Sequence, residues 1–204
     1  HDKTSGQKIN AYLDPEGQRF YASFAPSSNQ ATDLPPGGLT TLNPIDLIDT
    51  TAFAADGTVT VSGSFSRSAP DASTLRFYTV TGEDGGVLDP ISGVTLMPGD
   101  AGYAAAARNS ANLISSSGST LQSADQAIES FSFEAEVGKL YAPLITNKMT
   151  QEEYFAFASA NPDGCPHFNG VGANGWGVED SFGLGDIDYD DMLVRFSIVS
   201  PVDS

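Results

Sequence analysis

Apolar and polar residues alternate in several short runs along the chain, a pattern typical of β-strands with one buried face. The alternation is clearest in residues 58–65 and 131–135, and residues 75–80 are mainly β-branched and aromatic. Residues 139–146 and 192–199 form two further apolar runs. Gly, Pro, Asn and Asp, which favour turns, lie between these runs. The pattern therefore predicts strands in all five segments.

Two segments have features of short helices. Asp100 precedes an alanine-rich stretch and is suited to cap a helix over residues 100–113. Residues 150–158 begin with Thr-Gln-Glu-Glu, a capping box that predicts a second helix. Residues 44–50 are compatible with a short helical turn. Aromatic residues near the start indicate one or two further strands: Tyr12, Phe20 and Phe24.

These elements predict an all-β fold, a jelly-roll-like β-sandwich with one or two short helices. A chain of 204 residues suggests one domain, which we expect to span residues 1–204. Such a chain is long enough to bury about 70% of the surface that its unfolded form exposes.

The charge balance restricts the classes of partner. Nine Lys and Arg residues face 26 Asp and Glu residues, which gives a net charge of −17. This charge argues against nucleic acid and anionic membrane surfaces as partners, because both require cationic side chains. Bound divalent cations would offset the self-repulsion. The alternative is that acidity only keeps a secreted protein soluble.

A single cysteine, Cys165, excludes an intramolecular disulfide. Metal ions would then supply the cross-links of an extracellular protein. A buried, unreactive thiol is the favoured interpretation of Cys165 itself. Because no run of 18 apolar residues is present, we expect no direct membrane insertion.

The strongest chemical signal is the acidic segment of residues 185–191, Gly-Asp-Ile-Asp-Tyr-Asp-Asp. Calcium takes six to eight oxygen ligands, and alternating acids allow every second side chain to turn toward an ion. The segment is no EF-hand, since it lacks the glycine and the final glutamate of that loop. The alternative is an exposed acidic turn. The predicted ligands are six acids within thirteen residues: Glu179, Asp180, Asp186, Asp188, Asp190 and Asp191.

A second acidic region lies in residues 82–90. Glu83, Asp84 and Asp89 are candidate ligands of another calcium ion, and a hairpin loop with Asp-Gly turn chemistry is an equally good interpretation. Asp46 and Asp49 are expected to be solvated.

Residues 161–176 are the candidate wall of a ligand site, because loop-like segments of this length are often functional. Four residues in this segment are candidate ligand contacts: His167, Phe168, Asn174 and Trp176. Trp176 is equally well interpreted as a core anchor, and His167 is better interpreted as a structural hydrogen-bonding residue.

Several motifs together resemble a known family. They lie in residues 77–80 (FYTV), 97–106 (MPGDAGYAAA), 131–145, 177–180 (GVED) and 185–191 (GDIDYDD). Their order is similar to that of a secreted bacterial domain of unknown function with the pattern G-x-E-D followed by G-D-x-D-[FY]-x-D. It also resembles the calcium-dependent peptide-binding modules of repeats-in-toxin (RTX) adhesins.

The resemblance covers about residues 75–200, and the first 70 residues match nothing in it. The family often has Asn where this chain has Asp190. The resemblance implies a β-sandwich with several calcium ions on the six C-terminal acids. It also implies a pocket for the free C-terminal end of a peptide, on a host or neighbouring cell-surface protein.

The expected function is thus that of a calcium-dependent ligand-binding module of a bacterial adhesin, acting in cell adhesion and biofilm formation. We expect an extracellular, monomeric module of a longer chain. The alternatives are a calcium-stabilised structural module without ligand and a calcium-dependent module that binds a glycan. An enzyme is not expected, because no catalytic motif is present.

Overall fold

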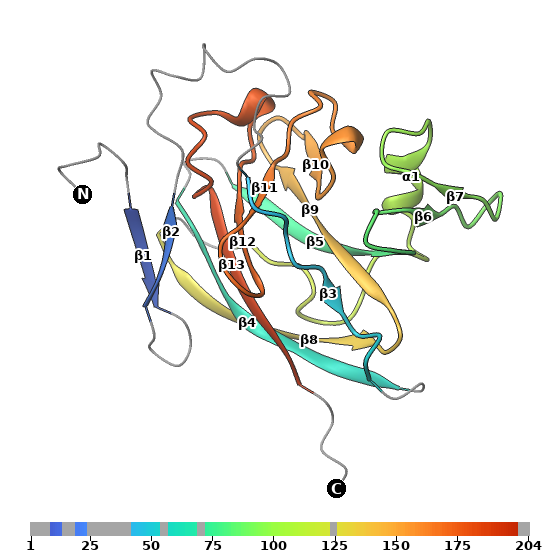
Figure 1. Ribbon diagram of the computed structural model, residues 1–204, viewed down its shortest axis with the longest axis horizontal. Helices are drawn as coiled ribbons and strands as arrows, with labels where there is room; N and C mark the ends of the chain where they lie inside the picture. Colours follow the sequence, from blue (N-terminus) through green and yellow to red (C-terminus); the bar gives the residue numbers. More distant parts are fainter. Residues whose placement is uncertain are drawn as a thin grey trace, which may run out of the picture.

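The computed structural model describes residues 42–53, 57–68, 72–122 and 126–199, and the backbone of β1 (Ile9–Leu13) and β2 (Arg19–Ser23). Two antiparallel sheets form a β-sandwich (Figure 1). The predicted fold class is therefore confirmed. The predicted strand residues Tyr12 and Phe20 lie in β1 and β2, which pair with each other, whereas Phe24 lies outside the described residues.

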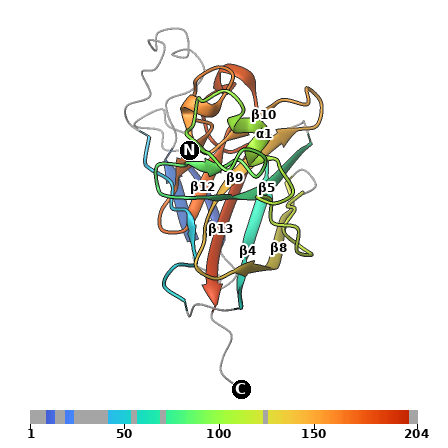
Figure 2. The same ribbon diagram turned by 90° about the vertical axis from the view of Figure 1, so that its right-hand side faces the viewer.

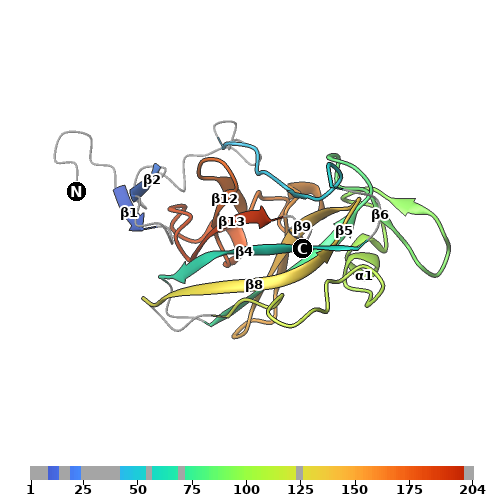
Figure 3. The same ribbon diagram turned by 90° about the horizontal axis from the view of Figure 1, so that it is seen from below.

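The larger sheet has five strands in the order β11, β12, β13, β4 and β8. The side view in Figure 2 shows β13, β4 and β8 next to one another, and β4 and β8 run together across the view in Figure 3. The bounds of these strands are Phe168–Gly170, Gly175–Val178, Met192–Val199, Thr58–Arg67 and Ile128–Glu136.

The smaller sheet is built around β9 (Leu140–Asn147). One side of β9 pairs over its whole length with β5 (Ser73–Val80), and the other side pairs with β10 (Glu153–Phe155) and β3 (Ile48–Asp49). The remaining elements are β6 (Val87–Leu88), β7 (Thr95–Leu96), α1 (Tyr103–Ala107) and the 3₁₀ turns η1 (Ala158–Ala160) and η2 (Phe182–Leu184).

The main core fills the space between the two sheets. Alternation along β8 turns Phe131 and Phe133 inward and leaves Ser132 outside. Leu75 and Phe77 of β5 meet them from the opposite sheet. The period-two pattern in the sequence therefore marks the face of each strand that closes the sandwich.

The outer face of the smaller sheet is also buried. Tyr78 and Leu144 lie on this face and pack against Tyr103 of α1 and Phe155 of β10. The Tyr103 hydroxyl donates a hydrogen bond to the carbonyl oxygen of Gly85 at 2.9 Å, which ties α1 to the loop before β6. Burial on both faces explains why residues 139–146 form a nearly continuous apolar run.

The predicted helix over residues 150–158 is wrong, because the segment contains β10 and the first residue of η1. Gln151 has a left-handed backbone (φ 64°), which prevents a helix from continuing. Glu153 instead forms ion pairs with Arg76 and Arg108 across the sheet. Tertiary contacts thus override the capping box.

The helix predicted over residues 100–113 exists only as the five residues of α1. Its C-terminal end is closed by Asn112, whose amide donates to the carbonyl oxygen of Ala106 at 2.8 Å. The helical turn suggested for residues 44–50 is wrong, because this segment is extended and contains β3. No helix in the described part of the chain is long and apolar enough to cross a membrane.

Gly63 of β4 allows the closest contact in the larger sheet. A Cβ atom at this position would lie 1.9 Å from the carbonyl oxygen of Arg195 in β13. We therefore expect Gly63→Ala to lower the free energy of unfolding by about 3 kcal/mol, because the strands must separate. Urea unfolding measures the change. Ser130→Ala, an exposed position on β8, is the control and should alter stability by less than about 0.5 kcal/mol. Equal effects of the two substitutions would contradict the prediction.

Candidate metal site

The acidic segment forms the loop between β12 and β13 at one end of the sandwich, at the top of Figure 1. β12 carries the chain into Glu179 and Asp180, and β13 begins directly after Asp191. Antiparallel pairing of β12 with β13 brings the two ends of the loop together. Acids that lie far apart in the loop sequence therefore approach each other in space.

Three residues of the loop have left-handed backbones: Leu184 (φ 70°), Ile187 (φ 59°) and Tyr189 (φ 55°). Each such residue costs about 1–2 kcal/mol, and the cost is greatest for a β-branched residue such as Ile187. Their side chains are buried together in a small core with Val171 and Leu193. Burial of these apolar side chains offsets the backbone cost and fixes the path of the loop.

This path brings three acids together. One oxygen each of Glu179, Asp186 and Asp188 lies within 4.8 Å of the others. Glu179 and Asp188 are buried, whereas Asp186 is exposed. Calcium and other hard cations bind oxygen ligands gathered in this way. The predicted alternation is therefore found in the structure for Asp186 and Asp188, with Ile187 turned into the core.

Glu179 is the central residue of this group, and its side chain is 0% exposed. Its Oε1 atom accepts a hydrogen bond from the backbone N–H of Tyr189 at 2.6 Å. Its Oε2 atom is buried and has no hydrogen-bond partner among the described residues. A buried carboxylate oxygen without a partner is costly, so this atom requires a proton or a cation.

Gly185 allows the loop to pass close to that atom. Its backbone (φ 52°, ψ −118°) is a conformation reserved for glycine. A Cβ atom at this position would lie 3.2 Å from Oε2 of Glu179. A side chain at this position would therefore crowd the Glu179 carboxylate.

Burial and like charges perturb the acids of the loop. Burial, followed by the nearby charge of Asp191, raises the pKa of Glu179 well above its usual range, against the lowering effect of the Tyr189 N–H. Burial and the neighbouring Asp180 likewise raise the pKa of Asp191. Without a cation, the site therefore favours protonated carboxyl groups.

Asp180, Asp190 and Asp191, also predicted as calcium ligands, lie outside the group of three. Asp180 is buried and accepts hydrogen bonds from the Ser73 hydroxyl and from the Asn147 amide. Asp191 accepts a hydrogen bond from the backbone N–H of Asp180 at 2.9 Å. Asp180 and Asp191 therefore fasten the two ends of the loop to each other and to β5 and β9. Asp190 is buried beside β12, where it forms a bridge with Val178.

His167 supports the site from behind. It is fully buried, and its ring stacks on Tyr154 with 3.6 Å between ring centroids. Nδ1 donates to the carbonyl oxygen of Glu179 at 2.8 Å, and Nε2 lies 2.9 Å from Oδ2 of Asp163. Burial lowers the pKa of His167, against the raising effects of this carbonyl and of Asp163. His167 is therefore a structural hydrogen-bonding residue in this structure and not an exposed contact for a ligand.

Asp163 was not predicted as a site residue. Asp163 joins residues 161–176, the predicted wall of the ligand site, to the acidic loop. Its Oδ2 atom, which contacts His167, also accepts a hydrogen bond from the backbone N–H of Gly183 at 2.8 Å. Burial raises its pKa, but hydrogen bonds from Cys165, Gly183 and His167 outweigh that effect and hold the pKa below its usual value. The four-residue spacing between Asp163 and His167 was the available sequence signal.

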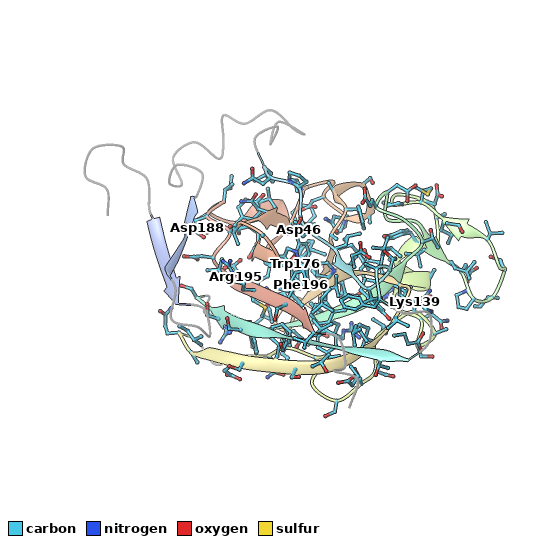
Figure 4. The ribbon with its side chains drawn as sticks, turned by 60° about the horizontal axis from the view of Figure 1, so that its bottom comes forward. Asp46, Lys139, Trp176, Asp188, Arg195 and Phe196 are labelled. Carbon is cyan, nitrogen blue, oxygen red and sulfur yellow. The ribbon has the colours of Figure 1, made fainter. Side chains whose placement is uncertain are left out.

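Three of the four predicted ligand contacts are buried: His167, Phe168 and Trp176. Trp176 is 0% exposed and packs against Phe77 and Phe196. Its indole N–H donates to the carbonyl oxygen of Asp46 at 2.8 Å, and Figure 4 shows these two residues side by side. Trp176 and Phe168 are therefore core residues, and the prediction that they contact a ligand is corrected. Asn174 alone of the four is exposed.

The second predicted ion site, at Asp84 and Asp89, lies in the segment between β5 and β7. Both carboxylate oxygens of Asp89 accept hydrogen bonds within their own loop, from the backbone of Ile91 and from Ser92. These bonds lower the pKa of Asp89, with the Ser92 hydroxyl as the largest cause. Neither residue belongs to a group of three acids in the described part of the chain. Turn chemistry therefore accounts for the contacts of the Asp89 carboxylate, and an ion at this loop stays a prediction.

Comparisons with protein-family models, curated proteins and solved structures gave no match to this chain. The candidate metal site therefore rests on its own geometry.

Proposed function

We propose that this protein is a calcium-dependent ligand-binding module of an extracellular bacterial adhesin, with the ion held by Glu179, Asp186 and Asp188. The observation that carries the proposal is the buried Oε2 atom of Glu179, which has no partner among the described residues and lies in a group of three acids. A divalent cation at this position supplies the missing partner and offsets most of the negative charge of the group.

Calcium fits the ligand set better than magnesium does. Three carboxylates supply up to six oxygens, and calcium accepts six to eight in flexible geometry. Magnesium requires a nearly ideal octahedron and retains several waters. Because Asp186 is exposed, one side of the ion would face solvent. That side would bind water or an oxygen of a ligand.

The ligand class follows from the resemblance to adhesin modules and from charge. A net charge of −17 repels the C-terminal carboxylate of a peptide. A bound calcium ion offsets two of the three negative charges of the group and provides a coordination position for that carboxylate. We therefore propose the free C-terminal end of a cell-surface peptide as the ligand.

Calcium should stabilise the protein, because the ion binds the folded state and not the unfolded state. At a free calcium concentration 100 times the Kd, the expected gain is about 2.7 kcal/mol. For a domain of this size, such a gain raises Tm by about 5–10 °C. Calorimetry in chelator and in calcium measures the shift.

Glu179→Gln should abolish this calcium response without destabilising the chelated protein. The neutral amide retains an oxygen for the Tyr189 N–H and removes the cost of a buried charge. The matched control is Glu134→Gln, an exposed position on β8 outside the site. An unchanged calcium response in Glu179→Gln would show that the ion, if bound, lies elsewhere.

The stability of the calcium-free protein should fall as the pH rises. The pKa of Glu179 is raised in the folded state, so the proton that it binds on folding contributes stability that is fully present below pH 4.5, its ordinary value. That contribution is lost as the pH rises from 4.5 toward the raised pKa. Unfolding in urea between pH 4.5 and 8, with chelator, measures the decrease.

Calcium should oppose this decrease in stability, because the ion takes the place of the proton. The same decrease in Glu179→Gln would contradict the assignment.

Peptides with free C-terminal ends should bind only in calcium. An array of C-terminally randomised pentapeptides, acetylated at the N-terminus, provides the probe, and the same array with amidated C-termini is the control. Binding of the free-acid array in calcium and its loss in chelator support the proposal. A calcium-induced rise in Tm with no binding to either array would leave the structural module as the function and reject peptide capture.

A further inference from the structure

A cavity of about 660 Å³ lies on the outside of the sandwich, apart from the acidic loop. It is bounded by residues 44–49, the start of β9, Glu83 and the exposed residue Asn174. Its volume lies in the range of about 300–1,000 Å³ that is typical of ligand sites. None of the three acids of the candidate metal site lines it.

The lining of the cavity combines an apolar wall with acidic groups. Leu47, Leu140 and Phe157 contribute to the wall. The Phe157 ring lies directly against Gly85, where a Cβ atom would lie 2.5 Å from it.

Three carboxylates belong to the same lining: Asp46, Asp49 and Glu83. Oδ2 of Asp46 accepts the backbone N–H of Asn174 at 2.8 Å, and Oδ1 of Asp49 accepts hydrogen bonds from Thr51. The Glu83 side chain forms no hydrogen bond or ion pair within the described residues. No Lys or Arg among the described residues lines the cavity, so these residues leave its charge uncompensated.

Asp46 is firmly placed. Its carbonyl oxygen binds the indole N–H of the buried Trp176, and its carboxylate binds the backbone of Asn174. Figure 4 shows Asp46 close to Trp176 and well away from Asp188 of the metal site. The cavity and the metal site are therefore separate places on the molecule.

The arrangement of the three carboxylates argues against a metal ion. In the described part of the chain, the search for acids with oxygens within 4.8 Å of one another finds Glu179, Asp186 and Asp188 but not the cavity acids. Spread acids beside an apolar wall match a cation with a long aliphatic stem. Lys and Arg side chains have that form, and such charge complementarity directs specific association.

We propose that this cavity binds a Lys or Arg side chain of a peptide segment in a protein partner. The aliphatic stem packs on Leu47, Leu140 and Phe157, and the charged head lies among Asp46, Asp49 and Glu83. A cavity of this volume also receives the neighbouring residues of the segment. This second recognition site goes beyond the proposed function and requires neither calcium nor a free C-terminus.

The test is a calorimetric titration of the protein, in chelator, with the peptide acetyl-Gly-Leu-Arg-Leu-Gly-amide. It measures the affinity of the peptide. Both ends of this peptide are blocked, so capture of a C-terminus does not contribute. The matched peptide carries citrulline, which is neutral and nearly isosteric, in place of arginine. We expect the arginine peptide to bind at least tenfold more tightly than the citrulline peptide, and more weakly as salt is added.

Glu83→Gln should weaken binding of the arginine peptide about two- to fivefold, the range expected for one exposed ion pair. Glu83→Lys should weaken it at least tenfold. Glu134→Gln, the same change at an exposed position outside the cavity, should leave binding unchanged. Circular dichroism of each variant checks that the fold is retained, as expected for changes at exposed positions.

Three results would overturn the proposal. The first is equal affinity for the arginine and citrulline peptides, or no binding of either at millimolar concentration. The second is equal affinity of wild-type protein and Glu83→Lys. The third is binding of acetyl-arginine-amide as tight as that of the pentapeptide, which would assign the cavity to a small cation. None of these results bears on calcium binding by Glu179, so the two proposals fail independently.

Discussion

The burial of the Glu179 carboxylate is the constraint on which this end of the molecule depends. A carboxylate removed from water must be protonated, paired or bound to a cation, and within the described residues it accepts one backbone N–H, that of Tyr189. The left-handed turns of the loop, the glycine at position 185 and the carbonyl contact of His167 all surround this one side chain. Each of them is costly or specific in isolation, and together they gather three acids that could hold a metal ion.

The sequence predicts much of the fold because most strands bury one face. Five predicted strands are found as β4, β5, β8, β9 and β13, and in each the alternation or the apolar run reflects a buried face. The short strands β3, β6, β7, β10, β11 and β12 were missed, since two to four residues carry too little periodicity. Residues 150–158 were mistaken for a helix because the ion pairs of Glu153 depend on arginines distant in sequence.

The candidate site was predicted in part for similar reasons. Alternation of acids identifies Asp186 and Asp188, which are local in sequence. It does not separate the acids that face a common point from Asp180 and Asp191, whose oxygens accept hydrogen bonds from distant or backbone groups. Trp176 was ambiguous from sequence, because a tryptophan beside an acidic motif suits a ligand site and a core equally. Its indole N–H is satisfied by Asp46, a residue 130 positions away.

The apolar anchors of the acidic loop have a consequence for the kinetics of ion exchange. Leu184, Ile187 and Tyr189 hold the loop against Val171 and Leu193 through contacts that involve no carboxylate. These contacts do not depend on an ion, so the proposed calcium ion would enter a loop whose path is fixed by apolar packing. Exchange of the ion would then be a local event, limited by dehydration and by proton release from Glu179, while the two sheets remain closed beneath it.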